Sequence, residues 1–232
     1  MNRLATSIRS SAFRYSALCV VLVAVCLPVF SYGLTKSLAE VGHCATRDHA
    51  WGVYVSGSYA YVADYGSGLR VINISDPANP YEAGYCDTPG SARDVYVSGA
   101  YAYVADYGSG LRVINISDPA HPNEVGYCDM PDDAYGVYVS GAYAYVADWI
   151  SGLRVINISD PAHPYEVGYC DMLGFASGVY VSGSYAYIAG DFSGLWIINI
   201  TDPENPYEVG YCAPPIMADG VYVSGSYAYV SD

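Results

Sequence analysis

The chain is built from a sequence that repeats with a fixed period. The pentapeptide Val-Tyr-Val-Ser-Gly occurs five times, each copy 42 residues after the previous one, beginning at Val53, Val95, Val137, Val179 and Val221. The same spacing separates the cysteines Cys44, Cys86, Cys128, Cys170 and Cys212, and no copy contains an insertion or a deletion. A period of about 20 to 50 residues is typical of a repeat array, in which each unit buries its faces against its neighbours.

One copy reads as four short strands. Residues 52–87 contain the segments GVYVS, YAYVAD, LRVINIS and YEAGYCD, which are rich in Val, Ile and Tyr and lack helical spacing. Turn-forming residues separate them, at Ser56–Ser58, Tyr65–Gly68 and Asp76–Pro80. Four antiparallel strands in about 40 to 45 residues is the size of one propeller blade. We call these strands a to d, with strand a innermost.

The predicted fold is therefore an all-β propeller with four complete blades, 52–87, 94–129, 136–171 and 178–212. A strand d is predicted before them at 40–44, and strands a and b of a partial fifth blade at 220–232. A ring closed from these pieces would lack one strand c. We therefore expect an open arc, or a fragment of a larger propeller, with an unpaired strand edge through which the chain self-associates.

Aromatic residues are abundant, with 27 tyrosines in the chain. In Tyr59–Ala63 both faces of the predicted strand are apolar, as expected for a sheet packed between two other sheets. We interpret the tyrosines chiefly as packing between blades. An aromatic surface that binds carbohydrate is the alternative.

One segment of each copy resembles a known repeat. GLRVINISDP begins at Gly68, Gly110 and Gly152, and GLWIINITDP begins at Gly194. These segments are similar to the LVIVD repeat, and the resemblance extends from Glu40 to Asp232. It implies blades of a secreted or surface-attached propeller, and it brings no catalytic residues with it.

The first 33 residues have the pattern of a signal peptide. Arg3, Arg9 and Arg14 precede an apolar run at 17–30, which is shorter than the ~20 residues that a bilayer-spanning helix needs. Cleavage would leave a mature chain of 34–232 that is secreted, periplasmic or on the cell surface and is not inserted in a membrane.

The chain is acidic, with a formal net charge of -14 that becomes more negative once three arginines leave with the signal peptide. Nucleic acid is therefore not an expected partner. No cofactor is expected, although acidity also suits calcium, so a calcium-stabilised adhesion repeat is one alternative. Cysteines at equivalent positions of adjacent blades should lie beyond the ~7 Å that a disulfide spans, and we expect them to be free and buried.

The copies differ at one end of the blades only. The a-to-b and c-to-d turns are nearly invariant, whereas the b-to-c loops and the d-to-a connections vary, which indicates either ligand binding or drift. We call the varying end the variable face. Residues just before strand a should ring the channel mouth, namely Trp51, Arg93, Tyr135, Ser177 and Asp219. Around them we expect Asp48, His49, Asp132, Asp133, Trp149, Phe175, Asp191 and Phe192.

These features predict a non-enzymatic binding or cell-surface structural module. A mixed aromatic and acidic face suits an extracellular protein or glycan ligand. The enzymatic alternative is a propeller hydrolase or lactonase with a metal at the central channel, for which Asp132, Asp133, Asp219 and His49 are the candidate ligands. His121 and His163 lie in the invariant turns, away from the variable face.

Overall fold

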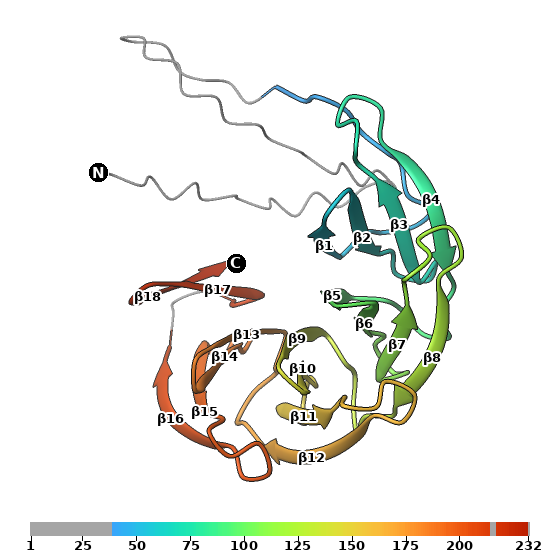
Figure 1. Ribbon diagram of the computed structural model, residues 1–232. Helices are drawn as coiled ribbons and strands as arrows, with labels where there is room; N and C mark the ends of the chain where they lie inside the picture. The colour runs from blue at the N-terminus through green and yellow to red at the C-terminus, as the bar shows by residue number, and fades with distance from the viewer. Residues whose placement is uncertain (1–38, 214–216, 232) are drawn as a thin grey trace, which may run out of the picture.

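The computed structural model describes residues 39–213 and 217–231, whose regular elements are all β-strands (Figure 1). The first sheet contains β1 (Gly52–Ser56), β2 (Tyr59–Ala63), β3 (Leu69–Asn73) and β4 (Tyr81–Cys86). The second contains β5 (Asp94–Ser98), β6 (Tyr101–Ala105), β7 (Leu111–Asn115) and β8 (Asn123–Cys128). The third contains β9 (Gly136–Ser140), β10 (Tyr143–Ala147), β11 (Leu153–Asn157) and β12 (Tyr165–Cys170). The fourth contains β13 (Gly178–Ser182), β14 (Tyr185–Ala189), β15 (Leu195–Asn199) and β16 (Tyr207–Cys212), and a hairpin of β17 (Gly220–Ser224) and β18 (Tyr227–Ser231) follows.

Each sheet is an antiparallel meander in sequence order, which confirms the predicted all-β blades. In the first blade, Tyr54 pairs with Tyr61 and Tyr61 with Val71. The a-to-b turn is tight because Gly57 adopts a positive φ of 59°, which glycine reaches without steric cost. A register shift between Val71 and Ile72 adds a bulge where β3 pairs with β4. Because this geometry recurs in every copy, all blades present the same two faces to their neighbours.

The blades follow one another around an open arc, with β1, β5, β9, β13 and β17 on its inner side and β4, β8, β12 and β16 on its outer side (Figure 1). The cores lie between adjacent blades. Tyr61 and Val71 of the first blade pack with Val95 and Val97 of the second. Ala60 and Val62, on the opposite face of β2, are also fully buried. Both faces of the middle strands are thus apolar because both are covered, as the sequence predicted.

Glycine on the outer strand sets the distance between neighbouring blades. A Cβ atom at Gly84 would collide with the carbonyl oxygen of Pro119, which lies in the c-to-d turn of the next blade. Gly126 has the same relation to Pro161, and Gly168 to Pro203. The invariant Asp-Pro turn therefore serves as a docking element that only a glycine can face.

The segment 40–44 differs from its prediction. It forms no strand, although Gly42 lies against Pro77 and Ala78 as Gly84 lies against the next turn. Strand d pairs with strand c of its own blade, and no such strand precedes this segment among the described residues. The segment therefore occupies the position of an outer strand without a ladder. No helix in the described part of the chain has the length and hydropathy to cross a membrane.

Candidate functional site

The variable face is continuous from blade to blade. Each b-to-c loop forms an antiparallel bridge with the connection that leaves the same blade: Tyr65 with Ala92, Tyr107 with Ala134, Trp149 with Ala176 and Asp191 with Ala218. The four loop residues have positive φ angles of 45°, 52°, 36° and 46°. Such angles strain a side chain larger than glycine by about 1–3 kcal/mol, and the strain persists only where surrounding structure holds it. Two backbone hydrogen bonds fix the loops at Tyr65, Tyr107 and Asp191, and one fixes the loop at Trp149, so the three aromatic side chains have a defined direction.

An arginine sits at the centre of a group of aromatic rings on this face. The Arg93 guanidinium carbon lies 4.4 Å from the ring centroid of Trp51, 5.1 Å from Tyr65, 5.0 Å from Tyr107 and 5.1 Å from Tyr135. These distances are within the ~6 Å range of cation–π attraction. The side chains come from the first, second and third blades, so the arrangement depends on the curvature of the arc. We call these five residues the arginine cage.

The aromatic row continues beyond the cage. Tyr135 stacks on Trp149 with ring centroids 4.6 Å apart, and Trp149 stacks on Phe175 at 4.5 Å. At the other end, His49 meets Tyr65 edge to face at 6.1 Å. The structure therefore brings together Trp51, Arg93, Tyr135, Trp149 and Phe175 from the predicted set. Tyr65 and Tyr107 belong to the row too and were not among the predicted residues.

The predicted carboxylates fall into two places. Asp132 accepts a hydrogen bond from the Ile150 backbone N–H at 3.1 Å. The interaction of the Tyr107 hydroxyl with the nearby Asp133 carboxylate raises the pKa of Tyr107 to about 12. Asp191 is buried in the fourth blade beside the exposed Asp219. Burial and then the charge of Asp219 raise the pKa of Asp191. Asp132 and Asp133 thus border the aromatic row, whereas Asp191 and Asp219 lie one blade further along.

Several predicted residues stand outside the row. Phe192 is 74% exposed at a loop tip, and it makes none of the ring contacts found among the described residues. Ser177 turns inward, where its hydroxyl donates to the carbonyl oxygens of Ala189 and Ala218 at 2.9 Å each. Asp48 holds the His49 imidazole at 2.6 Å. These residues therefore do not join the cage, although they lie on loops and connections of the variable face.

The candidate metal ligands do not converge. Within 39–213 and 217–231 there is no group of three or more His, Cys, Asp or Glu side chains placed to hold a metal ion. Asp132, Asp133, Asp219 and His49 thus do not form one metal centre. His121 and His163 pair with Asp118 and Asp160 at 2.9 Å in the c-to-d turns. Those turns lie at the opposite end of the blades from the variable face.

A buried ion pair supports the loops of the first three blades. Arg70 approaches Asp64 at 3.9 Å, Arg112 approaches Asp106 at 3.9 Å and Arg154 approaches Asp148 at 3.7 Å, and all three aspartates are fully buried. The aspartates also accept hydrogen bonds from the connection that enters the blade, such as the Arg47 and Asp48 backbone N–H groups on Asp64. Gly190 and Trp196 occupy the two positions in the fourth blade. The ion pair therefore fixes the variable face in three blades and is replaced by an aromatic contact in one.

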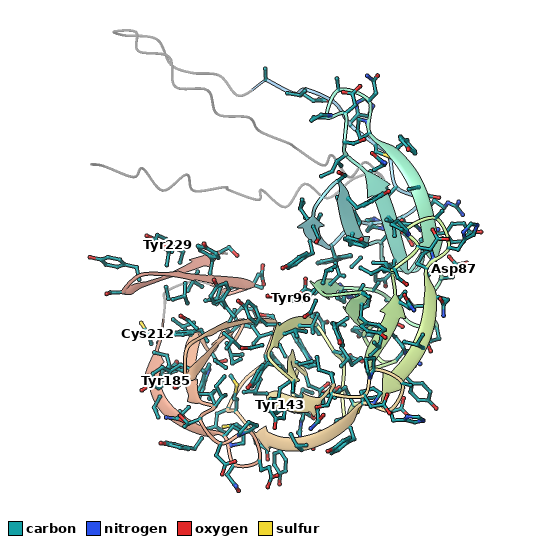
Figure 2. All side chains as sticks on the ribbon, viewed as in Figure 1. Asp87, Tyr96, Tyr143, Tyr185, Cys212 and Tyr229 are labelled. Carbon is teal, nitrogen blue, oxygen red and sulfur yellow. The ribbon has the colours of Figure 1, made fainter. Side chains whose placement is uncertain are left out.

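The inner strands carry two features that the sequence interpretation missed. Tyr54, Tyr96, Tyr138, Tyr180 and Tyr222 form a ladder along the inner side of the arc, with successive ring centroids 4.7, 4.7, 4.9 and 5.1 Å apart. Figure 2 shows Tyr96 on that inner side and Cys212 on the outer side.

The second feature is Asp94, which stands where the other four copies have glycine. It accepts hydrogen bonds from the backbone N–H groups of Val95 at 2.9 Å and Val137 at 3.0 Å, and burial raises its pKa to about 6. The departure from glycine was the signal that could have identified it.

The cysteines are free, as predicted, but they are less buried than expected. Cys44, Cys86, Cys128 and Cys170 are half-buried and Cys212 is exposed. The outer strand faces solvent on one side, so its cysteines are only partly covered. Desolvation raises the pKa of the four half-buried thiols.

The architecture defines the class of protein. Four-stranded antiparallel sheets of nearly identical sequence, set around an open arc with one strand of each innermost, are β-propeller-like blades. The chain belongs to the LVIVD repeat family, whose sequence model matches residues 48–88, 89–130, 131–172, 173–213 and 217–232. The match confirms the resemblance carried by the GLRVINISDP segments. This family is not a known family of enzymes, and a repeat scaffold of this kind suits a structural or binding module.

Two computationally designed proteins have similar solved structures. The crystal structure of Ika8 matches with a TM-score of 0.66 at 7% sequence identity, over 82% of this chain and 58% of that chain. The present chain thus spans less than two thirds of the length of Ika8. Ika4 matches with a TM-score of 0.56 at 7% identity, over 72% of this chain and 99% of that one. Likeness at this identity shows the fold alone. No curated protein matches the sequence.

Proposed function

We propose that this protein is an exported, non-enzymatic binding module that holds an extracellular glycan or protein on its variable face. The observation that carries the proposal is the row of aromatic rings around Arg93. Trp51, at one end of the cage, is 60% exposed, and aromatic and arginine side chains are the residues most enriched where binding energy concentrates. Backbone bridges and buried ion pairs hold the loops, so the row is ordered before any ligand arrives. Ligands bind more tightly to such preorganised groups because less entropy is lost.

The family and the fold support binding over catalysis. His121 and His163 are paired with aspartates in exposed turns outside the variable face, and no three carboxylates in the described part of the chain converge on one point. The proposed export depends on the signal peptide at 1–33, which lies outside the described residues. An extracellular location agrees with the ligand classes proposed here.

The test is retention of the purified protein on a panel of glycans and extracellular proteins, compared with variants. Trp51→Ala and Trp149→Ala should each weaken binding at least about tenfold, equivalent to about 1.4 kcal/mol. Tyr165→Ala is the matched control, because Tyr165 is an exposed aromatic on the outer strand β12 after an invariant turn. An equal loss of affinity in all three variants, or no loss in any of them, would contradict the proposal.

A second candidate function is self-association through the two ends of the arc. Val53 and Val55 on β1 are each 56% exposed, whereas their equivalents Val95 and Val97 on β5 are 3% and 7% exposed. At the other end Tyr229 is 48% exposed, and its equivalent Tyr61 is 5% exposed. We propose that a second copy of the chain covers these faces. Sedimentation velocity should show concentration-dependent dimers that a Val53→Ser/Val55→Ser variant does not form. A monomer at every concentration would contradict this.

A further inference from the structure

Arg93 differs from every other arginine in the described residues. Arg47 lies 3.0 Å from Glu82, and the three arginines of the buried ion pairs each contact at least one carboxylate. Arg93 contacts no carboxylate within 4.0 Å in the part of the chain that the structure describes, although the chain carries a net charge of -14. Its charge is therefore balanced only by the faces of four aromatic rings.

The rings leave the edge of the guanidinium available. Within the described residues no protein group accepts a hydrogen bond from the Arg93 side chain, and its Nε atom is buried without a partner. Ring centroids at 4.4 to 5.1 Å crowd the group and hold its orientation. A planar guanidinium fixed in this way presents its two terminal nitrogens, Nη1 and Nη2, as a fork, and a carboxylate matches that fork with two parallel hydrogen bonds.

The surroundings of the fork suit a sugar ring. Trp51 is largely exposed, and Tyr65, Tyr107 and Tyr135 are half-buried, so flat apolar surface lies beside the cation. The C–H face of a pyranose packs on such rings, and few placed polar groups then fix its orientation. The Asp133 carboxylate, which lies near the Tyr107 hydroxyl, is an acceptor for sugar hydroxyl groups at the margin of the row.

The charge of the chain limits the ligand further. A net charge of -14 repels a polyanion at long range, whereas one acid group can still pair with one arginine at short range. Resting on the binding function proposed above, we infer that the variable face binds a saccharide carrying a single carboxylate, such as a uronic or sialic acid. Arg93 binds the acid group and Trp51 packs against the ring.

Calorimetric titration of the full chain tests this with pairs of ligands that differ only in charge. The probes are galacturonic acid beside its methyl ester and a sialylated lactose beside its methyl ester, with lactose as a neutral reference. We expect the acids to bind at least about tenfold more tightly than the esters and the neutral sugar. Arg93→Gln should remove that difference, so that each acid binds no more tightly than its ester. The comparison of acid with ester needs no variant, so it holds even if Arg93→Gln lowers stability.

The outcomes separate this inference from the general binding function. Equal affinity for acid and ester would overturn the carboxylate assignment and leave glycan binding intact. Binding of a protein ligand that is lost in Trp51→Ala, with no binding of any saccharide, would overturn the assignment and leave the variable face as a protein site. Tight binding of a peptide C-terminal carboxylate in place of the sugar acids would also overturn it. No ligand on the face at all would contradict both.

Discussion

Gly190 and Trp196 lie in contact in the fourth blade, at the positions that a buried aspartate and arginine occupy in the other three. A Cβ atom at Gly190 would be 3.0 Å from the Trp196 Cδ1 atom, so the indole fills the space of the missing carboxylate. Trp196 also packs on Tyr211 at 4.8 Å, as Arg70 packs over Tyr85 at 4.7 Å. Gly190 and Trp196 are therefore compatible with each other. Gly190 cannot pair with an arginine, and Trp196 leaves no room for an aspartate at position 190.

The first prediction concerns that coupling. Trp196→Arg alone should destabilise the protein by about 3–5 kcal/mol, because it buries a guanidinium without a carboxylate. Gly190→Asp/Trp196→Arg should recover most of the loss, since it recreates the ion pair of the third blade. Urea denaturation of the two single variants and the double variant measures the interaction. Additive effects would show that the two positions are independent.

The second prediction concerns the spacing of the blades. Gly126→Ala should destabilise the protein by roughly 1–3 kcal/mol, because the added Cβ collides with the Pro161 carbonyl oxygen. Gly210→Ala is the matched control, since a Cβ there meets only Ile197, at 3.6 Å and beyond. Thermal unfolding of the two variants gives the comparison. Equal melting temperatures would contradict the docking role of the Asp-Pro turn.

The third prediction concerns pH. Burial raises the pKa of Asp94 from 3.8 to about 6, so the folded state binds a proton that the unfolded state has released in that interval. Its contribution to stability is complete at low pH and falls as the pH rises from about 4 to about 6. The lowered pKa values of Asp76 and Asp118 act in the opposite direction, below that interval. Between pH 4 and 7 the melting temperature should therefore change less with pH for Asp94→Asn than for the wild type. The same dependence of melting temperature on pH in the two proteins would refute the assigned titration of Asp94.

The fourth prediction concerns thiol reactivity. Cys212 is exposed and its four equivalents are half-buried, with thiol pKa values raised by desolvation. Reaction with a chromogenic disulfide at pH 7.5 should thus show one fast thiol from the repeats, which is missing in Cys212→Ser. Uniform rates would mean that the outer strands open readily in solution.

The period of 42 residues was sufficient to predict the blades and the strand boundaries within them, because apolar alternation and turn residues are local properties of the sequence. The same locality explains the errors. Residues 40–44 have strand composition, but a strand also needs a partner, which the local sequence does not reveal. The aromatic row was predicted only in outline, since Tyr65 and Tyr107 join Arg93 across three blades through the curvature of the arc. Asp94 is one departure from glycine, and its contact with Val137 becomes visible only in three dimensions.

The chain contains 3 tryptophans, and their positions provide an internal control for the central claim. Trp51 and Trp149 lie on the aromatic row, whereas Trp196 is buried in the fourth blade. The most direct measurement is the ¹H–¹⁵N spectrum of the three indole groups during titration with a ligand retained from the panel. We predict that the Trp51 and Trp149 signals shift with one saturation curve and that the Trp196 signal stays in place. Binding that leaves the first two signals unmoved would place the ligand elsewhere and contradict the account.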